Sequence, residues 1–170
     1  MSSYARQYRD VLVQPLYDSA ELFPGDSPRL FVEPRGQGSS VFVKGPKTGA
    51  DTNMNLSGQL PAGYWFSCSG IECEALRDTP RRMLEGVVLE FIIASKPFVT
   101  LPASRASCRL TEDEIARGWM LPGMKFEHSI AKKPLDLGPT CPWYVQATSV
   151  ASGVVVLRVA LNGYLYRPVE

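Results

Sequence analysis

Two glutamates, Glu72 and Glu74, are the residues whose spacing best fits hydrolytic chemistry. In an extended strand both side chains point to one face, with backbone positions roughly 7 Å apart. That separation is within reach of the carboxylate pair of glycoside hydrolases. The same residues also fit the solvent side of a half-buried strand, since Ile71, Cys73 and Ala75 alternate with them. We favour the solvent-facing interpretation, because water screens two like charges on one face.

Nucleophilic catalysis would depend on His128, the only histidine of the chain. Histidine titrates near neutral pH and serves as the base of Ser-His-acid hydrolases. The sequence has no Gly-x-Ser-x-Gly nucleophile elbow, however, and no signature of a reactive cysteine. A zinc hydrolase site is not expected either, because one histidine would leave mainly carboxylates or thiolates as ligands. We therefore interpret His128 as a surface or loop residue.

The four cysteines, Cys68, Cys73, Cys108 and Cys141, form no Cys-x-x-Cys pair and have no nearby histidine. This spacing does not predict a zinc site. The first residues lack the apolar core of a secretory signal, so we expect folding in a cytoplasm, where disulfides are disfavoured. We therefore expect free, mostly buried thiols.

Two polar segments carry residue types found in phosphate and calcium sites. Residues 45–49, Gly-Pro-Lys-Thr-Gly, lack the spacing of a phosphate-binding loop, and we interpret them as a turn. Residues 51–53, Asp-Thr-Asn, could offer oxygen ligands to calcium together with Asn55, but their spacing misses the EF-hand pattern. The sequence therefore predicts no catalytic residue, no cofactor-binding residue and no metal ligand.

Charge and hydropathy argue against two classes of protein, nucleic-acid-binding proteins and integral membrane proteins. Eighteen Lys plus Arg balance seventeen Asp plus Glu, and a net charge of +1 gives no field that attracts nucleic acid. The basic pairs at 81–82 and 132–133 lack interleaved aromatics and suit a solvated surface. The longest apolar stretch, residues 87–94, contains Glu90 and is far shorter than the roughly 20 residues that cross a bilayer. We expect neither specific nucleic-acid binding nor an integral membrane protein.

The remaining patterns predict one all-β domain over residues 1–170. A chain of this length suffices for one core, and its 14 Gly and 14 Pro suit many turns. We expect about eight short strands, as in sandwiches and barrels. Besides a terminal strand, the candidates are residues 11–16, 29–33, 41–44, 64–76, 87–93, 97–102, 119–126 and 144–149. Short helices are expected at 78–86 and, from a capping box, at 111–118, with an N-terminal arm at 1–10 and the longest loop at 45–60.

Residues 64–76 change the phase of their apolar alternation midway. Apolar side chains fall first at positions 64, 66 and 68, then at 71, 73 and 75. One extra residue near Gly70 would restore a common face, because a shift of one residue reverses every side chain. We therefore expect a β-bulge at this point.

The terminal run, residues 154–169, is the densest β segment of the chain. Asn162-Gly163 is a strong hairpin signal that would divide it into two arms. An unbroken strand would instead place one aliphatic face opposite a polar and aromatic face. The aliphatic residues on that face are Val155, Leu157, Val159, Leu161 and Leu165. This pattern segregates the side chains better, so we favour one long strand, bulged at the glycine, while the hairpin stays open as the alternative.

Aromatic and surplus apolar side chains indicate a binding role. Exposed aromatics stack on sugars or anchor interfaces. The candidates are Trp65, Trp119, Trp143, Tyr64, Tyr144, Tyr164 and Tyr166. The expected strand at 87–93 is apolar on both faces, and surplus apolar surface usually meets a partner.

In architecture and style, the whole chain resembles the single-jelly-roll capsid proteins of tailless icosahedral viruses. The resemblance rests on the series of short strands and on two segments. These are residues 50–62, Ala-Asp-Thr-Asn-Met-Asn-Leu-Ser-Gly-Gln-Leu-Pro-Ala, and residues 161–168, Leu-Asn-Gly-Tyr-Leu-Tyr-Arg-Pro. The chain is most similar to the small major capsid proteins of the sphaerolipovirus group of membrane-containing bacteriophages.

The resemblance implies a single jelly-roll β-sandwich or barrel that acts as a structural capsid subunit of a virion and is synthesised in the host cytoplasm. Members of that group have no catalytic residues to carry over. They form dimers or larger capsomers around an internal membrane, often beside a second, larger jelly-roll protein, so we expect these partners. One alternative is a carbohydrate-binding or glycan-hydrolysing β-sandwich that uses Glu72, Glu74 and exposed tryptophans. Another is an accessory spike or vertex protein of the same virion.

Overall fold

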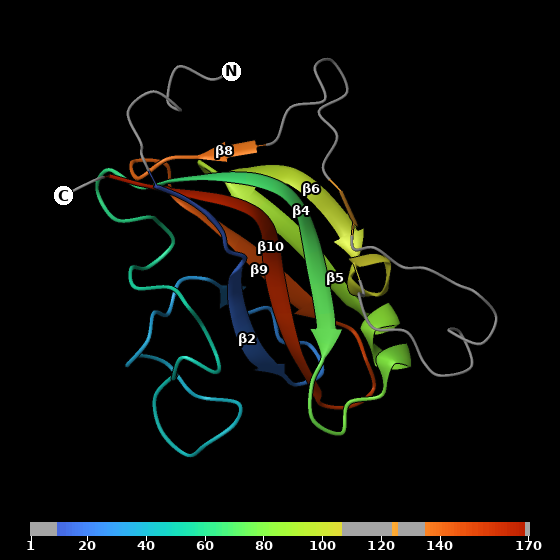
Figure 1. Cartoon of the computed structure of the whole chain (residues 1–170). Coiled ribbons are helices and arrows are strands. Elements are labelled where there is room, and N and C mark those ends of the chain that lie inside the picture. The colour runs from blue at the N-terminus through green and yellow to red at the C-terminus, as the bar shows by residue number, and fades with distance from the viewer. Residues whose placement is uncertain (1–9, 107–123, 126–134, 169–170) are drawn as a thin grey trace, which may run out of the picture.

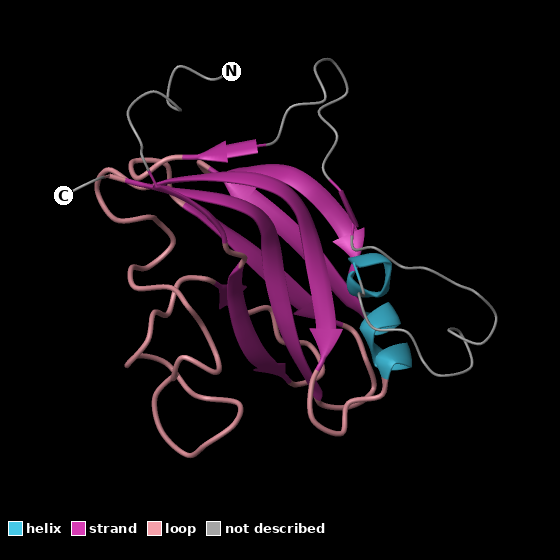
Figure 2. Ribbon diagram, viewed as in Figure 1, coloured by secondary structure: helices cyan, strands magenta, loops and turns pink. Residues whose placement is uncertain are grey.

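The protein is an all-β sandwich, as the sequence predicts. The computed structural model describes residues 10–106, 124–125 and 135–168, with only the backbone described at 124–125. The described strands form two antiparallel sheets that face each other (Figures 1 and 2). They are β1 (Asp10–Val13), β2 (Leu16–Leu22), β3 (Arg29–Leu30), β4 (Trp65–Ala75), β5 (Val87–Ile93), β6 (Lys96–Pro102), β7 (Met124–Lys125), β8 (Leu135–Leu137), β9 (Trp143–Ser149) and β10 (Val155–Arg167). Two 3-10 helices, η2 (Arg81–Gly86) and η3 (Ala103–Ala106), lie at one end of the sandwich (Figure 2).

The order of the strands in the two sheets is that of a jelly roll. In the first sheet β1 and β2 pair with one side of β10, β4 pairs with the other side, and β7 and β8 pair with β4. The second sheet runs β3-β9-β5-β6. The chain crosses repeatedly between the sheets, which gives the paired Greek keys that define a jelly roll. The expectation of a single jelly roll is confirmed.

The core fills the space between the sheets with aliphatic and aromatic side chains. Strand β5, the segment that is apolar on both faces, lies between β9 and β6 in the interior of the second sheet. The ring of the buried Trp143 is 5.0 Å from that of Phe31 and 6.1 Å from that of Phe91. These aromatic contacts join the second sheet to the loop that follows β3.

The predicted bulge of β4 is present, and its extra residue is Ser69. Gly70 pairs with Asn162 of β10, whereas Cys68 pairs with Gly163, so Ser69 has no opposite residue. The side chains of Phe66 and Cys68 before the bulge and those of Ile71 and Cys73 after it are all fully buried. Both phases of the alternation therefore reach the same core, as the sequence predicts.

Strand β10 is unbroken, which confirms the favoured interpretation over the hairpin. It continues through Asn162-Gly163 and pairs with β4 on both sides of this dipeptide. The predicted aliphatic face is buried at Val155, Leu157, Val159, Leu161 and Leu165. The bulge opposite Gly163 lies in β4 and not in β10, where the sequence suggested it.

One predicted strand, residues 41–44, is wrong. These residues lie in the long loop 31–64, which contains no strand. The carboxylate of Asp51 accepts the Val41 N–H, and the Ser40 hydroxyl accepts the N–H groups of Phe42 and Val43. Because side chains satisfy these backbone donors, the segment needs no neighbouring strand.

Three other elements differ in extent from their predictions. The first predicted strand, residues 11–16, ends at Val13 as β1, and β2 begins after Gln14-Pro15 at Leu16 and runs to Leu22, beyond the prediction. The second ends at Leu30 instead of Glu33, because Phe31 has a positive φ of 71° that leaves the extended region. The helix predicted at 78–86 begins only at Arg81.

Several predictions fall outside the described residues. They are the N-terminal arm up to residue 9, the helix at 111–118, most of the strand at 119–126, Cys108, Trp119, His128 and the basic pair at 132–133. From the strand at 119–126, Met124–Lys125 is described and forms β7. No helix in the described part of the chain is long and apolar enough to cross a membrane.

We predict that Gly163→Ala severely destabilises the protein. A Cβ atom at this position would lie 2.0 Å from the Ser67 carbonyl oxygen, so the β4–β10 pairing must shift. We expect a loss of about 3 kcal/mol or more in the free energy of unfolding, measured by urea titration. Asn162→Ala, one residue earlier, is the matched control and should cost about 1 kcal/mol or less. Equal stability of the two variants would contradict the observed packing.

Candidate functional site

The long loop 31–64 closes the side of the sandwich where the edge strands β2 and β3 meet (Figure 1). The side chain of Asn53 in this loop forms hydrogen bonds with backbone groups at the edge of β2, as a neighbouring strand would. Asn53 Oδ1 accepts the Tyr17 N–H at 2.9 Å, and Asn53 Nδ2 donates to the Pro15 carbonyl at 2.7 Å. The backbone edge of β2 is therefore occupied by residues of its own chain.

A buried ion pair attaches this loop to β2. The carboxylate of Asp18 accepts a hydrogen bond from Lys47 Nζ at 2.7 Å and from the backbone N–H groups of Ser19 at 3.0 Å and Phe31 at 2.6 Å. The side chains of Asp18 and Lys47 are almost completely buried. Sequence reasoning missed this pair and interpreted Lys47 only as part of a turn.

Burial raises the pKa of Asp18 above its ordinary value, although the neighbouring Lys47 ammonium and the N–H donors oppose part of this rise. A carboxylate so enclosed has no access to a substrate. Its three hydrogen-bond donors instead fix the start of the loop, including the left-handed backbone of Phe31. The pair is therefore a structural anchor.

Asp51, considered above as a calcium ligand, is also structural. Its carboxylate accepts hydrogen bonds from the Val41 N–H, the Ser40 hydroxyl, and both the N–H and the hydroxyl of Thr48. Burial alone would raise the pKa of Asp51, but these hydrogen bonds outweigh burial and lower it below 3.8. Among the residues that the structure describes, no group of His, Cys, Asp and Glu side chains could hold a metal ion.

The glutamate pair lies where the sequence places it, on the solvent face of β4. Both Glu72 and Glu74 are half-buried. Arg158 of β10 faces Glu74 across the sheet at 4.0 Å. Arg158 also lies over the rings of Tyr17 and Phe42. Glu74 therefore belongs to a charged network that ties the loop to the outer face of the first sheet.

The aromatic candidates that the structure describes do not gather into one sugar-binding platform. Trp143 is buried in the core, and Trp65 is half-buried on the outer face of the first sheet. Tyr144 lies on the second sheet, where the guanidinium of Arg29 stacks 4.6 Å from its ring centroid. Tyr164 and Tyr166 lie together on β10. Two of the three described cysteines, Cys68 and Cys73, are buried, and all three are free thiols.

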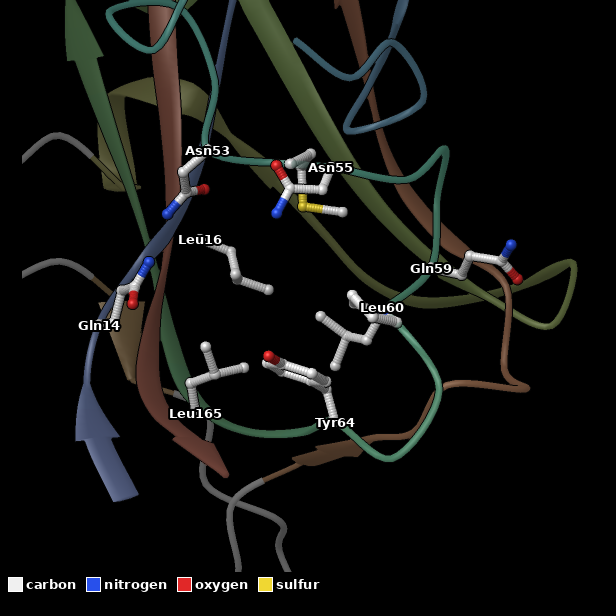
Figure 3. A pocket seen from close by; sticks show the side chains of 10 residues that line it. Gln14, Leu16, Asn53, Asn55, Gln59, Leu60, Tyr64 and Leu165 are labelled. Carbon is white, nitrogen blue, oxygen red and sulfur yellow. The ribbon is translucent and has the colours of Figure 1, made fainter. Parts of the chain in front are cut away.

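A small pocket lies between the start of β2 and the loop, with a volume of about 100 Å³. Figure 3 shows Leu16, Leu60 and Leu165 beside Tyr64, with the amide heads of Gln14 and Asn55 turned toward the cavity. Within the described part of the chain, these two amides make no hydrogen bond. The pocket is uncharged and far below the roughly 300–1,000 Å³ of ordinary small-molecule sites. It suits a single side chain or part of a sugar ring.

The outer face of β1 carries the most exposed apolar side chains near this pocket. Val11 is 48% exposed and Val13 is 83% exposed. Across the strand pair, Val11 faces Tyr166 and Val13 faces Tyr164, which is itself 47% exposed. We call these four residues the β1 strip. Leu12 points the other way and packs against the core, so the strip is the solvent side of an amphipathic edge strand.

Within the described residues, the other edge strands carry protecting features that β1 lacks. Strand β6 contains Lys96, Pro97 and Pro102, residue types that block pairing with another chain. Strand β3 has only two residues, and Asn53 occupies the start of the β2 edge at Tyr17. Between positions 11 and 13, β1 has neither a charge nor a proline. An exposed apolar edge of this kind is a site for pairing with another strand.

We predict strong coupling between Asp18 and Lys47. Lys47→Met leaves the buried carboxylate without its counter-charge and should lower the free energy of unfolding by about 3–5 kcal/mol. Asp18→Asn should also be strongly destabilising. The double variant Asp18→Asn/Lys47→Met removes both charges, so it should lose much less than the sum of the single losses. Strictly additive losses in urea titrations would show that the two side chains do not interact.

We predict a pH-dependent contribution from Asp51. Asp51→Asn replaces an acceptor of the Thr48 N–H by a donor and should cost about 1–3 kcal/mol at neutral pH. Because the folded-state pKa of Asp51 is lowered, its stabilisation is complete above 3.8 and is lost as the pH falls through the folded value. The stability difference between wild type and variant should therefore shrink in acid. A difference that is constant down to pH 2 would contradict this account.

The chain matches no protein-family model, no curated protein and no solved structure in the comparisons made with each of these collections.

Proposed function

We propose that the protein is a structural subunit that self-assembles into the icosahedral shell of a tailless, membrane-containing bacteriophage. One observation carries the proposal: a jelly-roll strand order in which, among the described residues, the edge strand β1 is apolar, exposed and unprotected. Shell proteins need such a rigid sandwich together with surfaces that join copies. The resemblance of the sequence to small phage capsid proteins supplies the kind of assembly.

The described polar groups support a structural role better than a catalytic one. The buried carboxylates of Asp18 and Asp51 are saturated by hydrogen bonds from the chain itself. Glu74 faces Arg158 on an open sheet face, not in a cleft. These side chains hold the loop 31–64 on the sandwich, as a subunit with a fixed outer shape requires.

A second apolar surface fits the partners that a shell would contain. Phe23 and Val150 belong to neighbouring loops, because the Gly25 N–H donates to the Ser149 carbonyl. Val154 joins them because the next residue, Val155, pairs with Leu22 beside Phe23. All three apolar side chains are exposed. This surface suits contact with the second, larger jelly-roll capsid protein in the virion. Contact with the internal membrane is the other interaction that the proposal includes.

A carbohydrate-binding sandwich is the second candidate, and the small pocket is the observation that favours it. Tyr64 and the unpaired amides of Gln14 and Asn55 could contact sugar hydroxyls. The glutamates and tryptophans that the sequence suggests for sugar binding are not at this pocket. Glu72 and Glu74 lie on the face of β4, and Trp143 is buried. The small volume limits any sugar to partial insertion.

We predict that the purified chain self-associates. Sedimentation velocity should give a mass that rises with protein concentration above that of the 18.8 kDa chain. Membrane-containing particles examined by electron microscopy should contain the chain in many copies. A strict monomer at high concentration, with no virion protein co-purifying, would contradict the proposal. A rise in melting temperature with a glycan, lost in Asn55→Ala, would instead favour the second candidate.

A further inference from the structure

We propose that two copies of the chain pair through the free edge of β1, antiparallel and centred on Leu12, so that their first sheets become one continuous sheet. The inference rests on the proposed self-assembly and names the interface that begins it. The partner at this edge is a second copy of the chain.

Within the described residues, the backbone of β1 is hydrogen-bonded to its own chain along one side, the side that faces β10. Asp10–Val13 pairs with β10 through the register Asp10 to Arg167 and Val13 to Tyr164. In the described part of the chain, no backbone group of these four residues bonds to anything on the opposite side. A strand in this state can extend the sheet by pairing with an equivalent strand.

Sheet geometry restricts the register of such a pair. Residues directly opposite one another point to the same face, so a symmetric antiparallel pair must be centred on one residue. Centring on Val11 would place Asp10 opposite the apolar Leu12. Centring on Val13 would place Val11 opposite Pro15, which has no N–H to donate.

Centring on Leu12 matches every position of the strand. Leu12 then faces Leu12 of the second copy on the core side, and Val11 faces Val13 on the solvent side. The two β1 strips join into rows in which tyrosines flank the valines, because Tyr166 lies beside Val11 and Tyr164 beside Val13. Aromatic and β-branched neighbours of this kind stabilise adjacent strands.

The ends of the pair are complementary in hydrogen bonding. The register places Asp10 opposite Gln14 of the second copy, so an amide that makes no hydrogen bond within the described residues meets a carboxylate acceptor. Asp10 is already ion-paired with Arg167 within its own chain, and the two Asp10 carboxylates lie at opposite ends of the paired strands. Because the pair has twofold symmetry, each of these contacts occurs twice.

Charge substitutions at Gln14, a half-buried residue that lines the small pocket, test this register. Gln14→Glu places a carboxylate opposite Asp10 of the second copy, and Gln14→Lys places an ammonium there. We expect Gln14→Glu to weaken self-association about tenfold, because the repulsion occurs twice, and Gln14→Lys to retain or strengthen it. Sedimentation equilibrium gives the dissociation constants, and thermal melting confirms that both variants fold.

A second pair of variants tests the strip itself. Val13→Lys introduces the charge with which natural edge strands prevent pairing, and it should abolish the dimer. Val43→Lys is the matched control, since Val43 is 55% exposed but belongs to the loop 31–64. This control should leave the dimer intact.

The outcomes separate this inference from the proposed function. If the wild type is a strict monomer, both fail. If the wild type associates but Gln14→Glu, Gln14→Lys and Val13→Lys associate equally well, the β1 interface is wrong while self-assembly stands. If Val150→Lys abolishes the dimer and Val13→Lys does not, the β1 interface is likewise wrong, and copies meet through the surface of Phe23, Val150 and Val154.

Discussion

The pairing of β10 with β4 is the constraint on which the rest of the structure depends. The two strands pair from Leu157 opposite Ala75 to Tyr166 opposite Trp65. Ser69 bulges out of this ladder, and the bulge keeps the core side chains of β4 on one face although the sequence changes phase there. Strand β10 pairs with β1 and β2 along its other side, so it fixes both the core face and the position of the free edge.

The loop 31–64 builds on this sheet through polar groups. Asp18 points from β2 toward the loop and binds Lys47 and the N–H of Phe31, while Asp51 organises the turn that carries Lys47. Asn53 then bonds the start of the β2 edge at Tyr17. Strands β1 and β2 lie in one line along β10, and among the described residues β1 is the part of this edge where another copy can add.

Local patterns predicted most of the strands that contact the core, but they missed nearly all of β2 and the whole of β8, which contribute the buried Leu22 and Leu137. The change of phase in residues 64–76 predicted the bulge, and the aliphatic face of residues 155–165 predicted one unbroken strand. The prediction failed at residues 41–44, where apolar composition suggested a strand but side-chain acceptors from Ser40 and Asp51 replaced a neighbouring strand. Composition alone does not reveal such local competition for backbone donors.

The anchor and the candidate interface depend on contacts between distant residues. Asp18 and Lys47 are 29 positions apart, and nothing in their own neighbourhoods marks them as partners. The protection of β2 by Asn53 is equally non-local. The apolar composition of β1 is visible in the sequence, but its role as a free edge follows only from the order of the strands.

Hydrogen exchange of the β1 amides that point away from β10, measured as a function of protein concentration, tests the central claim most directly. If β1 of two copies pair, these amides exchange rapidly in dilute protein and become protected as dimers form, while the amides of β6 stay unchanged. If the amides exchange at the same rate at every concentration while the protein associates, copies meet elsewhere and the account of β1 as the joining strand is contradicted.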